Sequence, residues 1–136
     1  WGLERFPDAP ADWLADWQRF ATVEDRHAQM LLTRMEELGV DAGARVVSDR
    51  LTQTCKRADD VVLFLFMLSS AEERGMEAGF IIGKQMQSYD PISAAVFHRI
   101  AEEEVEHVEM ANRALAAQDS VALKERAKAV SSFLPQ

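Results

Sequence analysis

Residues 101–108 of this chain read AEEEVEHV, and Glu104 in that stretch precedes His107 by three positions. The same spacing separates Glu24 from His27 near the start of the chain. An α-helix turns once every 3.6 residues, so this spacing places a carboxylate and an imidazole on one helix face, about one turn apart. Two such helices facing one interior would bring four potential metal ligands together.

The sequence around both pairs has the periodicity of amphipathic helices. Three long segments repeat apolar residues at alternating steps of three and four: residues 11–38, 58–87 and 90–117. An aspartate at position 59 or 60 can cap the second segment, and Asp90 followed by Pro91 is a start signal for the third. Gly39 is expected to end the first.

Two shorter segments complete the predicted set of helices. Residues 44–56 indicate either a short helix carrying Val47 and Leu51 or an irregular connection across the end of a bundle. Residues 120–132 indicate a short helix that ends before Pro135. Because no segment alternates with period two long enough to form a sheet, we predict an all-α fold.

Charged residues interrupt the apolar stripes of the long helices. Glu24 and His27 lie on the first stripe, Glu72 on the second, and Glu104 and His107 on the third. An unpaired carboxylate in an apolar interior is costly, and three carboxylates side by side also repel one another. Two divalent cations remove both problems, because their four positive charges meet the three negative charges of the glutamates.

The donor types favour particular metals. Carboxylate oxygens combined with imidazole nitrogens suit iron or manganese, whereas an all-oxygen site suits magnesium or calcium. Di-iron and di-manganese bundles take one Glu from each of two helices and a Glu-x-x-His pair from each of the other two. This chain supplies both pairs and one single Glu, for which Glu72 is preferred over Glu73. The sequence thus predicts two Fe ions, or two Mn ions, on Glu24, His27, Glu72, Glu104 and His107.

The heights of the ligands along their helices agree with one shared site. Glu72 lies about 17 residues before the turn near Tyr89, and Glu104 about 14 residues after it. At a rise of roughly 1.5 Å per residue the mismatch is only about 5 Å. Both side chains are therefore expected near the middle of the bundle.

A sixth ligand is not evident in the chain. Glu4 would lie some 15 Å too near the bundle end to serve. We expect the missing Glu on a helix upstream of Trp1, either outside this sequence or supplied by a partner chain. Leu3 and Phe6 fit the last turn of that earlier helix, so the first helix of the bundle is expected to be largely missing.

Composition excludes several classes of protein. The 136 residues are 48% apolar and 28% charged with a net charge of −8, which argues against a disordered chain and against non-specific nucleic-acid binding. No apolar run is long enough to span a bilayer. Cys55 is the single cysteine, so no intramolecular disulfide can form. With no secretory signal in the sequence, a cytoplasmic location is expected. We predict that residues 1–136 form one domain.

Other residues have ordinary structural interpretations. Gly75, Gly79 and Gly83 form a smooth ridge, which indicates close helix packing or, alternatively, space for substrate or oxygen beside the metals. His98 lies off the apolar stripe and is expected at the surface or between helices. Nothing in the sequence around Cys55 indicates a nucleophile or a metal ligand.

Two motifs resemble a known family. Residues 72–77 (EERGME) and 101–108 (AEEEVEHV), with Glu24 and His27, resemble a family of the ferritin-like superfamily that usually carries Glu-x-Arg-Gly-Leu-Asp and Asp-Glu-Val-x-His-Val. The similarity covers residues 5–115. It implies a ferritin-like four-helix bundle with a di-metal site, related to rubrerythrins and a tRNA-modifying hydroxylase, and it implies no substrate.

Three functional hypotheses follow. The first is a di-iron or di-manganese carboxylate protein that acts as an O₂-dependent oxidase or hydroxylase on a small molecule, as a homodimer or with a partner that supplies the missing helix. The second is a ferroxidase or iron-handling protein without an organic substrate. The third is a helical bundle without metal that uses its acidic, Trp-bearing surface for association.

Overall fold

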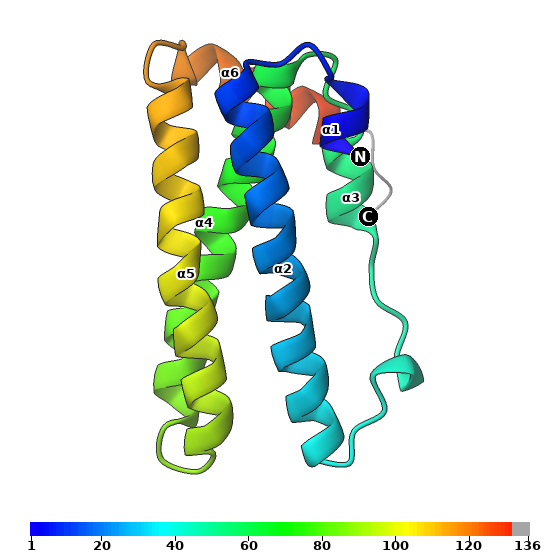
Figure 1. The fold of residues 1–136 in the computed structure, drawn as a ribbon, viewed down its shortest axis with the longest axis vertical. Helices are drawn as coiled ribbons and strands as arrows, with labels where there is room; N and C mark the ends of the chain where they lie inside the picture. The colour runs from blue at the N-terminus through cyan, green and yellow to red at the C-terminus, as the bar shows by residue number, and fades with distance from the viewer. Residues whose placement is uncertain (132–136) are drawn as a thin grey trace.

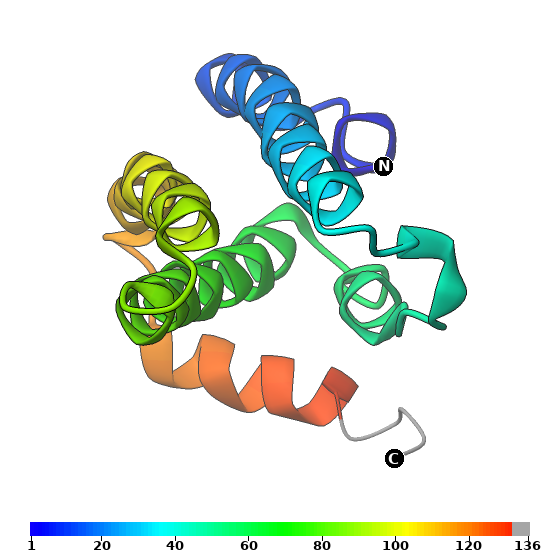
Figure 2. The same cartoon turned by 90° about the horizontal axis from the view of Figure 1, so that it is seen from below.

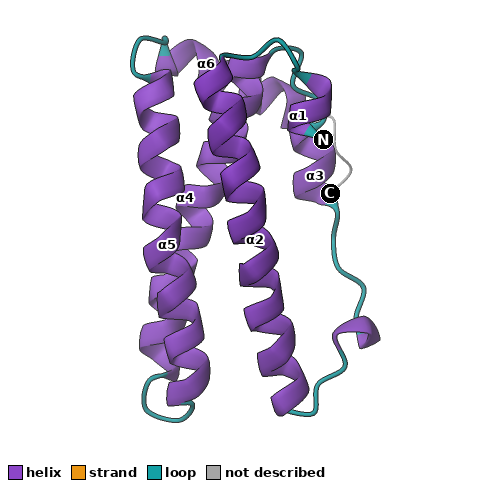
Figure 3. Ribbon diagram, in the orientation of Figure 1, coloured by secondary structure: helices purple, strands orange, loops and turns teal. Residues whose placement is uncertain are grey.

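The computed structural model describes residues 1–131, and within them the chain is helical with no strand, which confirms the predicted all-α class (Figure 3). The elements in chain order are α1 (Gly2–Arg5), α2 (Ala11–Glu37), the short 3₁₀ helix η1 (Ala42–Ala44), α3 (Arg50–Cys55), α4 (Val61–Met86), α5 (Pro91–Leu115) and α6 (Ser120–Ser131).

The three long helices α2, α4 and α5 run along the longest axis of the molecule (Figure 1). Helices α4 and α5 form an antiparallel hairpin through a short turn at one end. The connection through η1 and α3 returns the chain along the outside of the bundle, so α2 and α4 run in the same direction. Helix α6 crosses the other end beside α4 (Figure 2).

Local sequence signals explain where the long helices begin. Asp60, one of the two predicted caps, accepts a hydrogen bond from the backbone N–H of Leu63 at 2.8 Å. Asp90 accepts one from the N–H of Ser93 at 3.0 Å. Each carboxylate satisfies an N–H group that has no acceptor within its own helix. Gly39 follows α2 with φ of 68°, the left-handed conformation that glycine adopts without strain.

The connection before α4, predicted over 44–56 as either a short helix or an irregular connection, contains elements of both. Helix α3 contains Leu51, but Val47 lies in a non-helical stretch between η1 and α3 and is almost fully exposed. Residue 132 and Pro135, the predicted end of the last helix, lie outside the described residues. Leu3 belongs to the single turn of α1, and Phe6 directly follows it and is buried.

The apolar core lies between α2, α4, α5 and α6 and is rich in aromatic rings. Phe64 contacts Trp17 and Phe6 with ring centroids 5.4 Å apart in each case. Leu63 and Leu65 are almost completely buried beside these rings. Each large side chain in this core contributes roughly 1.5–3 kcal/mol through removal of apolar surface from water. The core holds α2 against α4 and thereby fixes the height at which their polar residues meet.

None of the helices within residues 1–131 combines the length and the hydropathy that a bilayer-spanning segment requires.

Candidate metal centre

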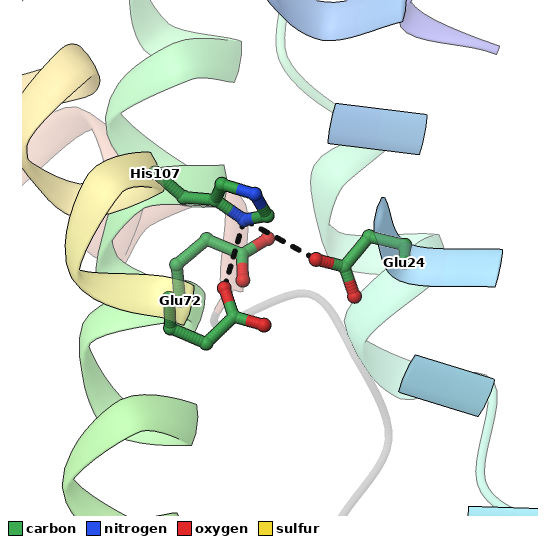
Figure 4. A group of neighbouring side chains, drawn as sticks. Glu24, Glu72 and His107 are labelled. Atoms are coloured by element: carbon green, nitrogen blue, oxygen red, sulfur yellow. Dashed lines mark ion pairs between the residues drawn. The ribbon is translucent and has the colours of Figure 1, made fainter. Parts of the chain in front are cut away.

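Polar side chains from three helices converge in the middle of the bundle. Glu24 comes from α2, Glu72 from α4, and Glu104 and His107 from α5. One ligand atom of each lies within 4.8 Å of one ligand atom of every other member. Figure 4 shows Glu24, Glu72 and His107 directed toward one another. The structure thus brings together four of the five residues that the sequence singled out, and Glu73 is not among them.

The imidazole of His107 lies close to two carboxylates of the cluster. Its Nδ1 is 2.8 Å from Oε2 of Glu104 and 3.2 Å from Oε1 of Glu24. One face of its ring packs against Phe20, with centroids 3.9 Å apart. The imidazole is therefore held between an apolar wall and two carboxylates.

His27, the fifth predicted residue, lies beside this four-residue group rather than within it. Its Nδ1 is 3.0 Å from Oε1 of Glu104 and 3.7 Å from Oε1 of Glu24. The two oxygens of Glu104 thus face different imidazoles. Glu104 therefore links His27 to the four-residue group.

Burial and unmet hydrogen bonds show that the residues fit a cation. The side chains of His27, His107 and Glu104 are 4–6% exposed, whereas Glu24 is 46% exposed. Nδ1 of His27 and Oε2 of Glu104 are buried and have no partner in hydrogen-bond geometry. Polar neighbours of these two atoms, Oε1 of Glu104 and Nδ1 of His107, lie at 3.0 and 2.8 Å respectively. Buried polar atoms are normally satisfied. A cation that accepts lone pairs from both atoms would satisfy them.

Protons compensate for the crowded charges in the absence of a cation. Burial, together with a hydrogen bond to Glu104, raises the pKa of Glu72 to about 8. Burial opposes the charged form of His107, but the carboxylates of Glu104 and Glu24 prevail and raise its pKa to about 9. Burial likewise opposes ionisation of Glu104, yet the His107 ring lowers its pKa. Without a metal, Glu72 and His107 therefore carry protons, and the proton on His107 gives its ring a positive charge. A metal ion would replace these protons.

Sequence reasoning missed Glu103, which contacts His27 from α5. Oε2 of Glu103 lies 2.9 Å from Nε2 of His27. Arg26 and Arg99 also pair with this carboxylate. Although burial opposes the change, hydrogen bonds from His27 and Arg26 lower the pKa of Glu103 to about 2. The spacing of Arg99 and Glu103, four residues apart on one helix, was the only local signal for this network.

A cavity of about 220 Å³ reaches the cluster from the side of α1. Glu24, Glu72 and His107 lie in its wall. The rest of its lining is mainly apolar, from Trp1, Gly2, Leu3, Trp17, Phe20, Ala21, Phe64, Leu65, Leu68, Ser69, Met110 and Ala111. No lysine or arginine lines it among the described residues, so the cavity suits a neutral apolar molecule better than an anion.

The remaining predicted residues lie away from the cluster. Glu4 has an 86% exposed side chain, in agreement with its exclusion as a ligand. His98 is an interhelix residue that packs against Gly83 and Phe80. Cys55 is buried, and burial raises the pKa of its thiol.

The glycine ridge is shorter than predicted. Gly79 and Gly83 lie in the α4–α5 contact, where an added Cβ at Gly79 would be 2.9 Å from Cβ of Ala101. Gly75 has open space around it and takes no part in that contact. Close helix packing therefore explains two of the three glycines.

Comparison with known proteins identifies the family. Residues 1–133 match the family described as "Protein of unknown function (DUF455)", and the chain belongs to that family. No curated protein and no solved structure shows a significant match to the chain.

Proposed function

We propose that this protein is a ferritin-like di-metal carboxylate protein that acts as an O₂-dependent oxidase or hydroxylase. The observation that carries the proposal is the convergence of Glu24, Glu72, Glu104 and His107 within 4.8 Å, with His27 beside them. Two Glu-x-x-His pairs and a single Glu are the donor types of di-iron and di-manganese bundles. The long return connection between α2 and α4 is also the kind of crossover that ferritin-like folds contain.

The residues divide naturally between two ions. Glu72 and His107 would hold one ion, and His27 would hold the other. Glu24 and Glu104 would supply further carboxylate oxygens. Iron or manganese at this site would supply electrons for the reduction of O₂, and an external donor would supply any more that the reaction needs. A sixth protein ligand from another helix remains part of the proposal.

The cavity favours an enzyme over the alternative of iron handling. A protein that only oxidises or stores iron needs no apolar chamber beside the metals, whereas an enzyme needs space for its substrate. The 220 Å³ cavity provides such space directly beside Glu72 and His107. A cytoplasmic location and the absence of nucleic-acid partners stay predictions from composition.

Metal analysis tests the proposal. Protein purified without chelator is expected to contain Fe or Mn, and His107→Ala should lose most of it. His98→Ala is the matched control, because His98 lies on the same helix but outside the cluster. Equal metal content in the wild type and His107→Ala would contradict the site.

Oxygen uptake then separates the two functions. An iron-handling protein consumes O₂ in proportion to added Fe(II) and needs no organic compound. The proposed enzyme should turn over repeatedly only when a reductant and an organic substrate are both present. Stoichiometric uptake with Fe(II) alone, and no turnover with any organic compound, would favour iron handling.

A further inference from the structure

The hydrogen bond between His27 and Glu103 joins α2 to α5 at the edge of the cluster. Nε2 of His27 lies 2.9 Å from Oε2 of Glu103, and the two side chains are 4% and 16% exposed. Nδ1 of the same ring faces the cluster, 3.0 Å from Oε1 of Glu104. The ring is therefore placed between one carboxylate outside the cluster and another within it.

This placement determines which nitrogen of His27 is available to a metal. A neutral imidazole carries one N–H group and one lone pair. Because Glu103 is an acceptor, the proton is favoured on Nε2, and the lone pair is then on Nδ1. Nδ1 of His27 is also one of the buried atoms without a hydrogen-bond partner. The contact thus orients the ring and leaves the nitrogen that faces the cluster free to ligate.

Two arginines fix Glu103 in this position. Arg26, directly before His27 on α2, pairs with Oε2, and Arg99, one turn earlier on α5, pairs with Oε1. Both carboxylate oxygens are therefore occupied. The two positive charges also offset the negative charge of Glu103, so this carboxylate does not add to the repulsion among the cluster glutamates.

The other histidine of the cluster has different surroundings. Glu103, which contacts His27, directly precedes Glu104 on α5. The equivalent position on α2, directly before Glu24, is Val23, whose side chain cannot accept a hydrogen bond. The ring of His107 packs instead against Phe20. The two Glu-x-x-His pairs are therefore not equivalent, although their spacing is identical.

We propose that Glu103 is a positioning residue that holds His27 with Nδ1 toward the centre, so that one of the two bound ions depends on Glu103 and the other does not. This role rests on the proposed di-metal function. Carboxylates that hold the outer nitrogen of a metal-bound histidine typically contribute 10–100-fold to metal affinity.

Zinc binding to the metal-free full chain provides the test, because Zn(II) is diamagnetic and does not react with O₂. Calorimetric titration compares the wild type with Glu103→Ala and Glu103→Gln. Glu102→Ala is the control, since Glu102 is an exposed carboxylate one position away. We expect Glu103→Ala to weaken one of two binding events 10–100-fold and leave the other within about 3-fold. Glu103→Gln, whose amide oxygen still accepts from Nε2–H, should recover part of the loss.

A spectroscopic readout separates positioning from a general structural effect. Long-range ¹H–¹⁵N spectra of the zinc-loaded wild type should show His27 ligating through Nδ1 with the proton on Nε2, and Glu103→Ala should lose this signature. Equal zinc affinity, or an unchanged His27 signature, in Glu103→Ala would overturn the role of Glu103 alone. A wild type that binds no metal, with Zn(II) and Fe(II) each tried, would overturn the proposed function.

Discussion

His27 and His107 face each other across the bundle with ring centroids 6.4 Å apart and an angle of 33° between their planes. Both rings turn Nδ1 toward the carboxylate of Glu104, at distances of 3.0 and 2.8 Å. One carboxylate therefore lies between two imidazoles from different helices. Without a metal, protons on Glu72 and His107 offset part of the negative charge at this point, so the charge of the cluster is sensitive to pH.

Metal binding should release protons. Glu72, with a pKa of about 8, and His107, with a pKa of about 9, are both largely protonated at pH 7 in the metal-free protein. A ligand must lose its proton to bind a cation. We expect the whole cluster to release up to about two protons when it binds metal at pH 7, one from Glu72 and one from His107. The apparent zinc affinity should rise between pH 6 and 9. Calorimetry in buffers of different ionisation enthalpy measures the protons directly. Affinity independent of pH over this range would contradict the assignment.

The metal-free protein should lose stability as pH rises. A carboxyl whose pKa is raised to about 8 in the folded state stabilises the fold fully below its unfolded pKa, near 4.3, and this contribution is lost as pH rises through 8. The raised pKa of His107 acts in the same direction, from about 6.5 to 9. We expect the Tm of metal-free protein to fall from pH 6 to pH 9.

Glu72→Gln isolates the contribution of Glu72. The amide resembles the protonated carboxyl in shape and has no charge, so the metal-free variant should show a weaker decline of Tm across the same range. Circular dichroism melts at several pH values check this. Glu73→Gln is the control, because that neighbouring carboxyl is exposed, and it should keep the wild-type decline. A decline of the same size in Glu72→Gln would show that titration of Glu72 is not its cause.

Two glycines on α4 should respond to alanine in opposite ways. Gly75 has open space around the position that a methyl group would take, with no atom within 4 Å, so Gly75→Ala should raise the free energy of unfolding by roughly 0.5–1 kcal/mol through helix propensity. At Gly79 the new Cβ would lie 2.9 Å from Cβ of Ala101, and overpacking of this kind typically costs about 1–3 kcal/mol. Urea denaturation of both variants measures the difference. Equal effects would show that α4 and α5 have room for a methyl group between them at Gly79.

The cap of α4 should also contribute to stability. Asp60 accepts a hydrogen bond from the N–H of Leu63 and pairs with Arg126 of α6. Asp60→Ala should lower the free energy of unfolding by about 1 kcal/mol, the usual cost of a lost cap. Asp60→Asn keeps the capping oxygen and should lose less.

The contribution of Asp60 should disappear in acid. Burial opposes its ionisation, but the hydrogen bond from Leu63 and the pairing with Arg126 lower its pKa. A lowered pKa means that the stabilisation is present above the unfolded value near 3.9 and is lost as pH falls through the folded value. The wild type and Asp60→Ala should therefore converge in stability at the acid end of a pH series. A constant difference at all pH values would contradict this.

Periodicity was sufficient to predict the long helices and many of the residues that face inward, although Glu24 on the predicted stripe is 46% exposed. The caps at Asp60 and Asp90 and the inward stripes depend on neighbours within one or two turns, and these neighbours are visible in the sequence. Matching helix heights also predicted that Glu72 lies near Glu104, because the rise per residue of a helix is fixed.

Only the tertiary structure decided how the helices meet. The position of His27 beside the four-residue group, and its contact with Glu103, depend on how far α2 is rotated and shifted against α5. The sequence alone does not encode that offset locally, since it results from many side chains packing at once in the core around Phe64. A helix repeats itself along its own axis, so the kind of residue facing inward is a local property, whereas its partner is a property of the whole packed bundle.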